Sequence, residues 1–228
     1  MPKKNKYYKL DHRPENFGLL LKGGSLDQLH KYNDKFDQCM IVSDWDDELK
    51  VLGNYLLGKE ITHFVNRSMA SCLTKENYIK YNIKNIQLGQ VFRWDHFVLM
   101  RSYLHYASML LDLNVYFLPE KLRKYNDRFG DEYKLKFPNT GVLSIIYTLD
   151  ILKPKNLWLF GLDFYTTDYY VEQIKSPDPR PKTVKNSKIV GLNIIDAACN
   201  YFEEFSDTNI MLGSYYDEWP DIQNLHLL

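Results

Sequence analysis

The sequence predicts an α/β protein with one parallel sheet and helices on both of its faces. Short, almost continuous apolar runs alternate along the chain with longer amphipathic stretches, which is typical of strand–helix–strand units. The apolar runs lack a polar alternation, as expected for strands buried on both sides. Glycines stop two of these runs, at Gly23-Gly24 and at Gly161. A chain of 228 residues can form one domain of this type with a substantial core.

The first predicted unit is a strand at 17–22 that Gly23-Gly24 stops. Ser25 then stands where a helix N-cap belongs, before the amphipathic stretch 26–30. This order places backbone N–H groups and a helix start at the carboxyl end of a strand, where phosphate groups bind in Rossmann-like sheets.

The remaining elements follow from the same two patterns. Further apolar runs predict strands at 39–43, 61–65, 83–88, 156–160 and 209–212. Amphipathic spacing predicts helices at 45–57, 75–81, 139–149 and 192–205, and one or two more within 91–113. The segment 176–188 is rich in Pro, Lys and Asp without periodicity, so we expect a mobile loop there and a lid over residues 174–190.

Charge and cysteine content exclude several classes of partner. The 29 basic and 29 acidic residues balance, so no overall field attracts nucleic acid or a membrane surface. No segment is long and apolar enough to cross a bilayer and no signal peptide is recognisable, which predicts a cytoplasmic protein.

Cys39, Cys72 and Cys199 lack metal-ligand spacing and predict free, buried thiols. The 18 Tyr and 12 Phe fit a stacking site, an aromatic core or a homo-oligomer interface equally well.

Several short motifs follow one another in a recognisable order. They are 22–26 (Lys-Gly-Gly-Ser-Leu), 41–44 (Ile-Val-Ser-Asp), 57–66 ending at Asn66, 139–142 (Asn-Thr-Gly-Val) and 159–165 (Leu-Phe-Gly-Leu-Asp-Phe-Tyr). In this order they resemble the core of the bacterial sialyltransferases of glycosyltransferase family 42. The stretch 138–141 is also similar to the small sialyl motif of the eukaryotic family 29 enzymes. The resemblance covers most of the chain, and its specificity comes from the order of the motifs.

The resemblance implies a single nucleotide-sugar-binding domain over residues 1–228, with the sialyltransferase-type variant of the glycosyltransferase A fold. It implies that a sialic acid-like sugar is transferred from a CMP-activated or related nucleotide-activated donor to a glycan hydroxyl. The partners would be this nucleotide sugar, as co-substrate, and the glycan acceptor. No cofactor or metal would be required, because hydroxyl and amide donors can stabilise the charge of the departing phosphate.

Individual site residues also follow from the resemblance. The expected nucleotide- and donor-binding residues are Lys22, Gly23, Gly24, Ser25, Asp44, Asn66, Asn139, Thr140, Gly141 and Asp163. The expected catalytic residues are Tyr165, Tyr169, Tyr170 and Lys188. The tyrosines would hydrogen-bond the leaving phosphate, and Lys188 is one candidate, with Lys185 and Asp178, for the base that the acceptor hydroxyl needs.

Three positions depart from the family pattern. Lys22 and Asp44 stand where the family usually has Asn, and the general-base His has no counterpart because no His lies between residues 106 and 225. Either the donor sugar differs, or the base comes from elsewhere, or activity is absent. Lys22 could neutralise phosphate charge directly, which would suit an altered nucleotide sugar.

Two alternative functions and several structural interpretations remain open. Asp44 and Asp46 form an Asp-x-Asp pattern, which could hold a metal ion in a transferase that uses a nucleotide-diphosphate sugar. Asp46 also fits the first turn of a helix, where acidic residues complement the helix dipole. The chain could instead be a catalytically inactive nucleotide- or glycan-binding module. Asp163 could simply fix the chain after a strand, and His63 is expected to be a hydrogen-bonded core residue.

Overall fold

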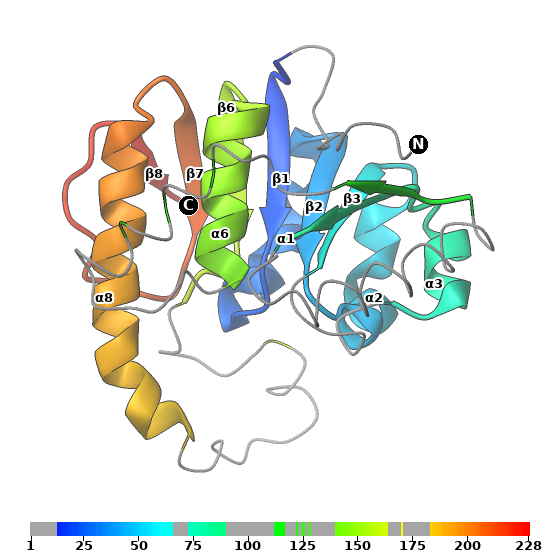
Figure 1. Ribbon diagram of the computed structural model, residues 1–228, viewed down its shortest axis with the longest axis horizontal. Coiled ribbons are helices and arrows are strands. Elements are labelled where there is room, and N and C mark those ends of the chain that lie inside the picture. The colour runs from blue at the N-terminus through cyan, green and yellow to red at the C-terminus, as the bar shows by residue number, and fades with distance from the viewer. Residues whose placement is uncertain are drawn as a thin grey trace, which may run out of the picture.

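The fold is a single eight-stranded parallel sheet with helices on both faces (Figure 1). The computed structural model describes residues 13–65, 73–89, 112–116, 140–163 and 183–228, of which 183–193 as helical backbone only, together with Leu122, Tyr125, Arg128 and Tyr170. The strands are β1 (Asn16–Leu20), β2 (Gln38–Val42), β3 (Glu60–Val65), β4 (Asn85–Leu88), β5 (Asn114–Tyr116), β6 (Asn156–Phe160), β7 (Asn209–Gly213) and β8 (Leu225–Leu227).

The order of the strands places a topological switch point at the middle of the sheet. The order is β5-β4-β3-β2-β1-β6-β7-β8, and every neighbouring pair is parallel. The chain therefore builds outwards from β1 to β5, returns to the other side of β1 with β6, and continues outwards to β8. This doubly wound topology confirms the predicted Rossmann-like α/β fold.

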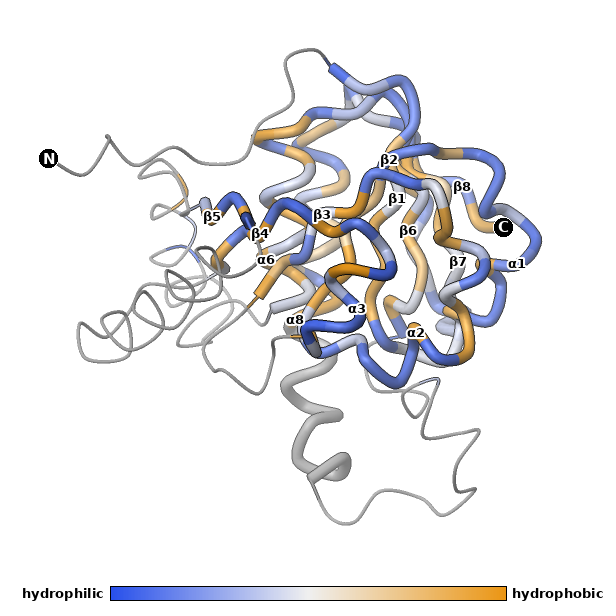
Figure 2. The backbone as a smooth tube through the Cα atoms, turned by 90° about the vertical axis from the view of Figure 1, so that its right-hand side faces the viewer, coloured by the Kyte–Doolittle hydropathy of each residue, from blue (hydrophilic) through white to orange (hydrophobic). Residues whose placement is uncertain are grey.

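Helices cover the two faces in separate groups. One face carries α6 (Thr140–Tyr147), which continues as a π-helical turn (Thr148–Leu152), and α8 (Thr183–Glu204). The other face carries the 3-10 helix η1 (Gly24–Gln28), α1 (Leu29–Tyr32), η2 (Asn33–Lys35), α2 (Asp46–Leu52), η3 (Gly53–Leu56) and α3 (Lys75–Lys80). In Figure 2 the central strands are the most hydrophobic part of the tube, and the outer turns are hydrophilic.

Successive residues of a strand pack against opposite helical layers. Leu19 of β1 packs in the cluster of α6 and α8, whereas Leu20 packs in the cluster of α1 and α2. Both are completely buried, and each buried leucine contributes about 1.5–3 kcal/mol to folding. Because helices cover both faces of the sheet, the predicted strands have no polar alternation.

Four features differ from the predicted elements. Strands β5 and β8 were not predicted, and the first two predicted helices are partly 3-10. Helix α8 begins at Thr183, so the part of the predicted loop 176–188 from that residue onward is helical. The stretch 183–188 is mostly polar, and an amphipathic pattern therefore gives no signal for it. The remainder of the predicted lid 174–190 and the predicted helices of 91–111 lie outside the described residues.

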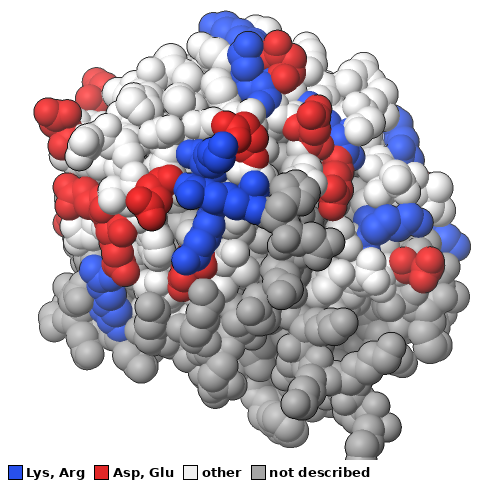
Figure 3. Space-filling view, turned by 90° about the horizontal axis from the view of Figure 1, so that it is seen from above, with Lys and Arg blue, Asp and Glu red and all other residues white. Residues whose placement is uncertain are grey.

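The buried cysteines and the mixed surface charges agree with what the composition predicts. Cys39 and Cys199 are free and buried, as predicted, and burial raises the pKa of their thiols to about 12 and about 11. Cys72 lies outside the described residues. Within the described part of the chain, no helix has the length and hydropathy needed to span a membrane. Seen from above the view of Figure 1, basic and acidic side chains are interspersed over the described surface (Figure 3).

Candidate functional site

The candidate site lies at the carboxyl ends of the central strands. In open parallel sheets, ligands bind outside these ends at the switch point, which here lies between β1 and β6. The segments 22–25, 43–44 and 161–163 follow β1, β2 and β6 directly. Helix α6 runs antiparallel to the strands, so its start at Thr140-Gly141 lies at the same edge (Figure 1). The structure therefore brings most of the described candidate residues to one edge of the sheet.

The Gly23-Gly24 turn is a closed junction between strand ends and not an open cradle of N–H groups. The Gly23 N–H donates to the Gly161 carbonyl oxygen at 2.9 Å, and the Ser25 N–H donates to Asp163 Oδ2 at 2.8 Å. The pairing of β1 with β6 thus continues past both strand ends, since the Leu21 N–H also donates to the Phe160 carbonyl oxygen. The free N–H groups expected for phosphate binding are consumed here by the protein itself.

Ser25 has a structural role that differs from the predicted one. The N-cap of η1 is Gly23, and Ser25 lies inside the 3-10 turn with no exposed surface. Its hydroxyl donates to the Gly213 carbonyl oxygen at 2.9 Å and accepts from the Gly161 N–H at 3.2 Å. The N-cap prediction was therefore wrong, because the buried hydroxyl joins the ends of β6 and β7 to the turn.

A substitution of Gly23 should show how tightly the junction is packed. A Cβ at this position would collide with Asp163 Oδ2 and would lie 2.7 Å from the Gly161 carbonyl oxygen, so Gly23→Ala should reduce the free energy of unfolding by about 2 kcal/mol. Gly58→Ala is the control, since its Cβ would meet nothing within 4 Å and only its positive φ of 80° opposes alanine. Urea titration measures both, and a smaller loss for Gly23→Ala than for Gly58→Ala would contradict the packing.

Asp163 connects three strand ends from a buried position. Its side chain accepts hydrogen bonds from the Ser25 N–H, from the Tyr215 N–H at 2.8 Å and from the Ser214 hydroxyl at 3.3 Å. Only 2% of the residue is exposed. These contacts favour the structural interpretation of Asp163 over the nucleotide-binding one, because its oxygens are directed into the protein.

Lys22 lies between two carboxylates at the ends of β1 and β2. Its Nζ lies 3.0 Å from Asp44 Oδ1, 2.7 Å from the Asp44 carbonyl oxygen and 3.1 Å from Glu48 Oε1. Burial opposes the charge on Lys22, yet the nearby Glu48 and Asp44 raise the pKa of its ammonium group overall. Burial also raises the pKa of Glu48, and Lys22 offsets part of that effect. The convergence of Lys22 and Asp44 fits the predicted site. The positive charge of Lys22 is, however, already paired with the carboxylates of Asp44 and Glu48.

Ser43 holds Asp44 in place through a left-handed backbone. Its φ of 71° is unusual for a residue other than glycine, and such a conformation costs about 1–2 kcal/mol. His63 Nε2 lies 2.6 Å from the Ser43 carbonyl oxygen, and His63 Nδ1 lies 2.9 Å from the Tyr78 hydroxyl. The carbonyl can only accept, so Nε2 carries the proton and Nδ1 accepts from Tyr78. His63 is thus the predicted hydrogen-bonded core residue.

His63 makes the stability of the protein depend on pH. Burial lowers the pKa of His63 to about 4, whereas an unfolded histidine titrates near 6.5. The unfolded chain binds one more proton between these values, so acidification through this window should remove up to about 3 kcal/mol of stability. The loss is absent above pH about 6.5, where both states are neutral.

Urea titrations at several pH values test this dependence. His63→Gln should be less stable near neutral pH but should lose less stability between pH about 6.5 and about 4 than the unaltered protein does. His30→Gln is the control, because His30 is exposed. Identical pH slopes for the unaltered protein and His63→Gln would contradict this role.

Asp46 serves a neighbouring helix and does not pair with Asp44. Its carboxylate accepts from the Thr74 N–H at 3.0 Å, from the Thr74 hydroxyl and from Asn77 Nδ2 at the start of α3. Asp46 also begins α2, as predicted for a residue of a first helical turn. Over the described parts of the chain, no group of three or more His, Cys, Asp or Glu side chains is arranged to hold a metal ion. The partners of Asp46 disfavour a metal-binding Asp-x-Asp pair.

The other predicted residues divide into those that the structure describes and those that it does not. Thr140 and Gly141 are half-buried at the start of α6, and the Tyr170 N–H donates to the Lys22 carbonyl oxygen at 2.9 Å. Lys188 lies in α8, where only the backbone is described. Outside the described residues lie Asn66, Asn139, Tyr165 and Tyr169.

Three residues that shape this edge were not predicted from the sequence. Glu48 belongs to the Lys22 cluster, and the Tyr215 hydroxyl donates to Asp27 Oδ2 at 2.5 Å. Burial and this hydrogen bond raise the pKa of Tyr215 to about 12. Asp27 follows the glycine turn closely, whereas Glu48 and Tyr215 are distant in the sequence and reach this edge only through the order of the strands.

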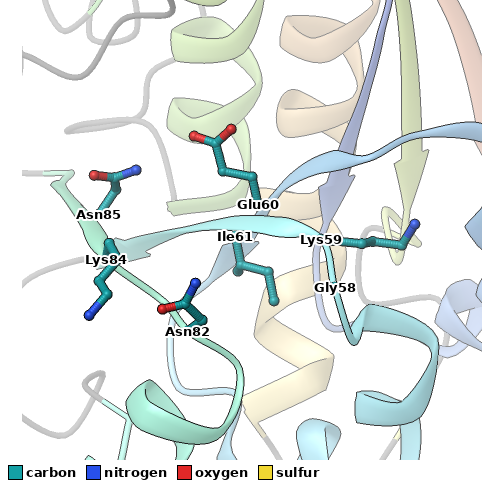
Figure 4. A pocket seen from close by; sticks show the side chains of 7 residues that line it. All are labelled: Gly58, Lys59, Glu60, Ile61, Asn82, Lys84 and Asn85. Atoms are coloured by element: carbon teal, nitrogen blue, oxygen red, sulfur yellow. The ribbon is translucent and has the colours of Figure 1, made fainter.

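A shallow pocket of about 290 Å³ lies at the opposite edge of the sheet. Figure 4 shows its lining, which comes from the starts of β3 and β4: Gly58, Lys59, Glu60, Ile61, Asn82, Lys84 and Asn85. None of the predicted site residues lines this pocket. It lies at the amino ends of the strands, away from the switch-point edge.

Comparisons with known proteins identify the fold. The sequence matches no family model and no curated protein at a significant level. The structure is similar to the sialyltransferase CstII from Campylobacter jejuni in complex with the substrate analogue cytidine-5′-monophosphate, with a TM-score of 0.58 and 16% identity over 91% of this chain and 83% of CstII. It is also similar to a mammalian sialyltransferase in complex with Gal-beta-1-3GalNAc-ortho-nitrophenol, with a TM-score of 0.53 and 13% identity over 88% of this chain and 70% of that chain. The chain therefore has a sialyltransferase-like fold, as its ordered motifs predicted.

Proposed function

We propose that this chain is a glycosyltransferase that transfers a sialic acid-like sugar from a CMP-activated or related nucleotide-activated donor to a glycan hydroxyl. One observation carries the proposal: the described parts of the motifs that follow β1, β2 and β6, together with the start of α6, lie at the switch-point edge of a sialyltransferase-like fold. The CstII structure is a complex with a cytidine nucleotide, and the mammalian one is a complex with a Gal-beta-1-3GalNAc derivative. The nucleotide and the glycan would therefore meet outside the carboxyl ends of β1, β2 and β6.

The start of α6 is the part of this edge best suited to the phosphate and the donor sugar. Thr140 and Gly141 stand at its first turn, where backbone N–H groups and the helix dipole favour negative charge. Charge develops on the departing phosphate as the glycosidic bond breaks, and fixed donors stabilise it in the transition state. The resemblance adds Asn66, Asn139, Tyr165 and Tyr169 to this set.

Tyr170 is suited to donate a hydrogen bond to the leaving phosphate. It lies against the turn after β1, and burial, with Asp27 and Tyr55 nearby, raises the pKa of its phenol. The phenol therefore stays protonated at neutral pH and can act as a donor. Lys188 is proposed as the base, a role that would require a strongly lowered pKa.

Calorimetric titration with nucleoside monophosphates and an assay of donor turnover test the proposal together. The protein should bind a cytidine or related nucleotide and should release it from a CMP-sugar in the presence of glycan acceptors, and Thr140→Ala should slow this release by about tenfold or more. Glu203→Ala, on the exposed side of α8, is the control. If no nucleotide binds, the proposal is wrong.

A catalytically inactive nucleotide- or glycan-binding module is the second candidate. The observation that favours it is the missing histidine between residues 106 and 225, the region in which the resembled family has its base. Such a module would bind a nucleotide or a glycan in the same titrations without any donor hydrolysis or transfer.

A cytoplasmic location and assembly into a homo-oligomer are also part of the proposal. Cell fractionation would test the location, and light scattering would test the oligomeric state.

A further inference from the structure

Asp44 occupies a position at which nucleotide-binding sheets recognise ribose. It follows β2, the neighbour of β1, at the carboxyl edge of the sheet. In Rossmann-type sheets, an acidic side chain about twenty residues after the glycine turn accepts hydrogen bonds from ribose hydroxyls. Asp44 has this spacing from Gly24. The resembled family has a neutral amide here, so Asp44 is a specific feature of this chain.

The Asp44 carboxylate is held on one side and accessible on the other. Lys22 Nζ binds Oδ1 and the carbonyl oxygen of Asp44, and the side chain of Asp44 is 58% exposed. Oδ2 has no hydrogen-bond partner in the described part of the chain. A carboxylate oxygen only accepts hydrogen bonds, so the group that binds it must be a donor such as a hydroxyl.

The charge of the cluster disfavours a phosphate at this point. One ammonium group, that of Lys22, lies between the carboxyl groups of Asp44 and Glu48. Glu48 is 1% exposed, and its Oε2 has no hydrogen-bond partner among the described residues. Among the described residues, the cluster therefore has more carboxylate oxygens than ammonium donors, and its one positive charge lies between two carboxyl groups. A neutral ligand with hydroxyl groups fits this environment, whereas a phosphate would be repelled.

The backbone fixes the position of the carboxylate before a ligand binds. The left-handed conformation of Ser43 directs the chain into Asp44, and His63 holds the Ser43 carbonyl oxygen. The Lys22 contacts restrict Asp44 further. A ligand therefore finds an acceptor that is already oriented, which reduces the entropic cost of binding.

We propose that Asp44, oriented by Lys22, accepts hydrogen bonds from the ribose hydroxyls of the bound nucleotide and so selects ribonucleotides over 2′-deoxyribonucleotides. The inference rests on the proposed function, because it needs a nucleotide at the switch-point edge. It also gives Lys22 a different role from direct phosphate neutralisation. The phosphate would then point toward the start of α6, and the ribose toward the end of β2.

Calorimetric titration with matched nucleotide pairs tests the selection. CMP, UMP, AMP and GMP are compared first, and the tightest binder is then compared with its 2′-deoxy counterpart. The unaltered protein should bind the ribonucleotide about tenfold or more tightly, the factor expected for a hydrogen bond to a charged group. In Asp44→Ala this preference should fall to less than about threefold. Asp47→Ala is the matched control, since Asp47 is a half-buried neighbour paired with Lys50, and it should retain the full preference.

The outcomes separate the inference from the proposed function. Equal affinities of the unaltered protein for the two nucleotides would overturn the inference and leave the proposed function intact. A preference that survives in Asp44→Ala would overturn it as well, because another residue would then recognise the ribose. If none of the four ribonucleotides binds, both the inference and the proposed function are wrong. A thermal melt of Asp44→Ala confirms that the variant is folded.

Discussion

Replacing Asp163 by alanine is expected to lower the free energy of unfolding by about 5 kcal/mol. The carboxylate is 2% exposed and accepts hydrogen bonds from the Ser25 N–H, the Tyr215 N–H and the Ser214 hydroxyl. Hydrogen bonds to a charged group contribute about 1.5–3 kcal/mol each, and the donors left behind would be buried without an acceptor. The three loops after β1, β6 and β7 would lose their common attachment.

Urea unfolding of three variants tests this expectation. Asp163→Asn keeps the shape of the side chain but turns one acceptor into a donor, so its loss should be large but smaller than that of Asp163→Ala. Asp44→Ala is the control: it lies at the same edge, but its side chain is 58% exposed, and it should cost less than about 1 kcal/mol. A loss of less than about 1 kcal/mol for Asp163→Ala would show that the carboxylate does not hold the junction.

Replacing Lys22 by methionine is expected to destabilise the protein by about 4 kcal/mol at neutral pH. The substitution leaves Glu48 buried with no cation beside it, and breaking a buried ion pair on one side costs about 3–5 kcal/mol. Burial already raises the pKa of Glu48, and without Lys22 this pKa should rise further. The folded variant would then bind a proton that the unfolded chain has released. Its deficit should therefore be smallest at acidic pH and should grow as the pH rises.

A second substitution separates charge from packing in this cluster. Lys22→Met combined with Glu48→Gln removes both charges, and it should recover most of the stability that Lys22→Met loses. Urea titrations of the two single variants and of the double variant give the coupling between the two positions. An equal cost for Lys22→Met at acidic and neutral pH, with no recovery in the double variant, would contradict this role of charge.

The central part of the fold was predictable because local and tertiary signals agree there. The apolar runs at β1, β2, β3, β6 and β7 are buried on both faces, so they lack polar alternation and are bounded by clear stop signals. The edge strands β5 and β8 have only three residues each, and half-buried or exposed side chains dominate them. Such short runs have no periodicity of their own, and pairing with a neighbouring strand defines them.

The candidate site was predictable in position but not in its contacts. Parallel strands place the segments after their carboxyl ends at one edge of the sheet, so the order of the motifs predicts that Lys22, Asp44 and the start of α6 lie at the same edge. The contacts depend on partners that are far away in the sequence. Ser25 stands before an amphipathic stretch and looks like an N-cap, yet its hydroxyl is taken up by Gly161 and Gly213. The local sequence around Ser25 does not predict these distant partners.

Amide NMR during a titration with CMP tests most directly whether this edge binds a nucleotide. We expect the largest shift changes at the carboxyl edge of the central strands, at Lys22, Asp44, Thr140 and Gly141. The pocket lined by Gly58, Asn82 and Asn85 at the amino edge should be unaffected. Changes concentrated at that pocket, or no changes at all up to saturating nucleotide, would contradict the assignment of the carboxyl edge as a nucleotide site.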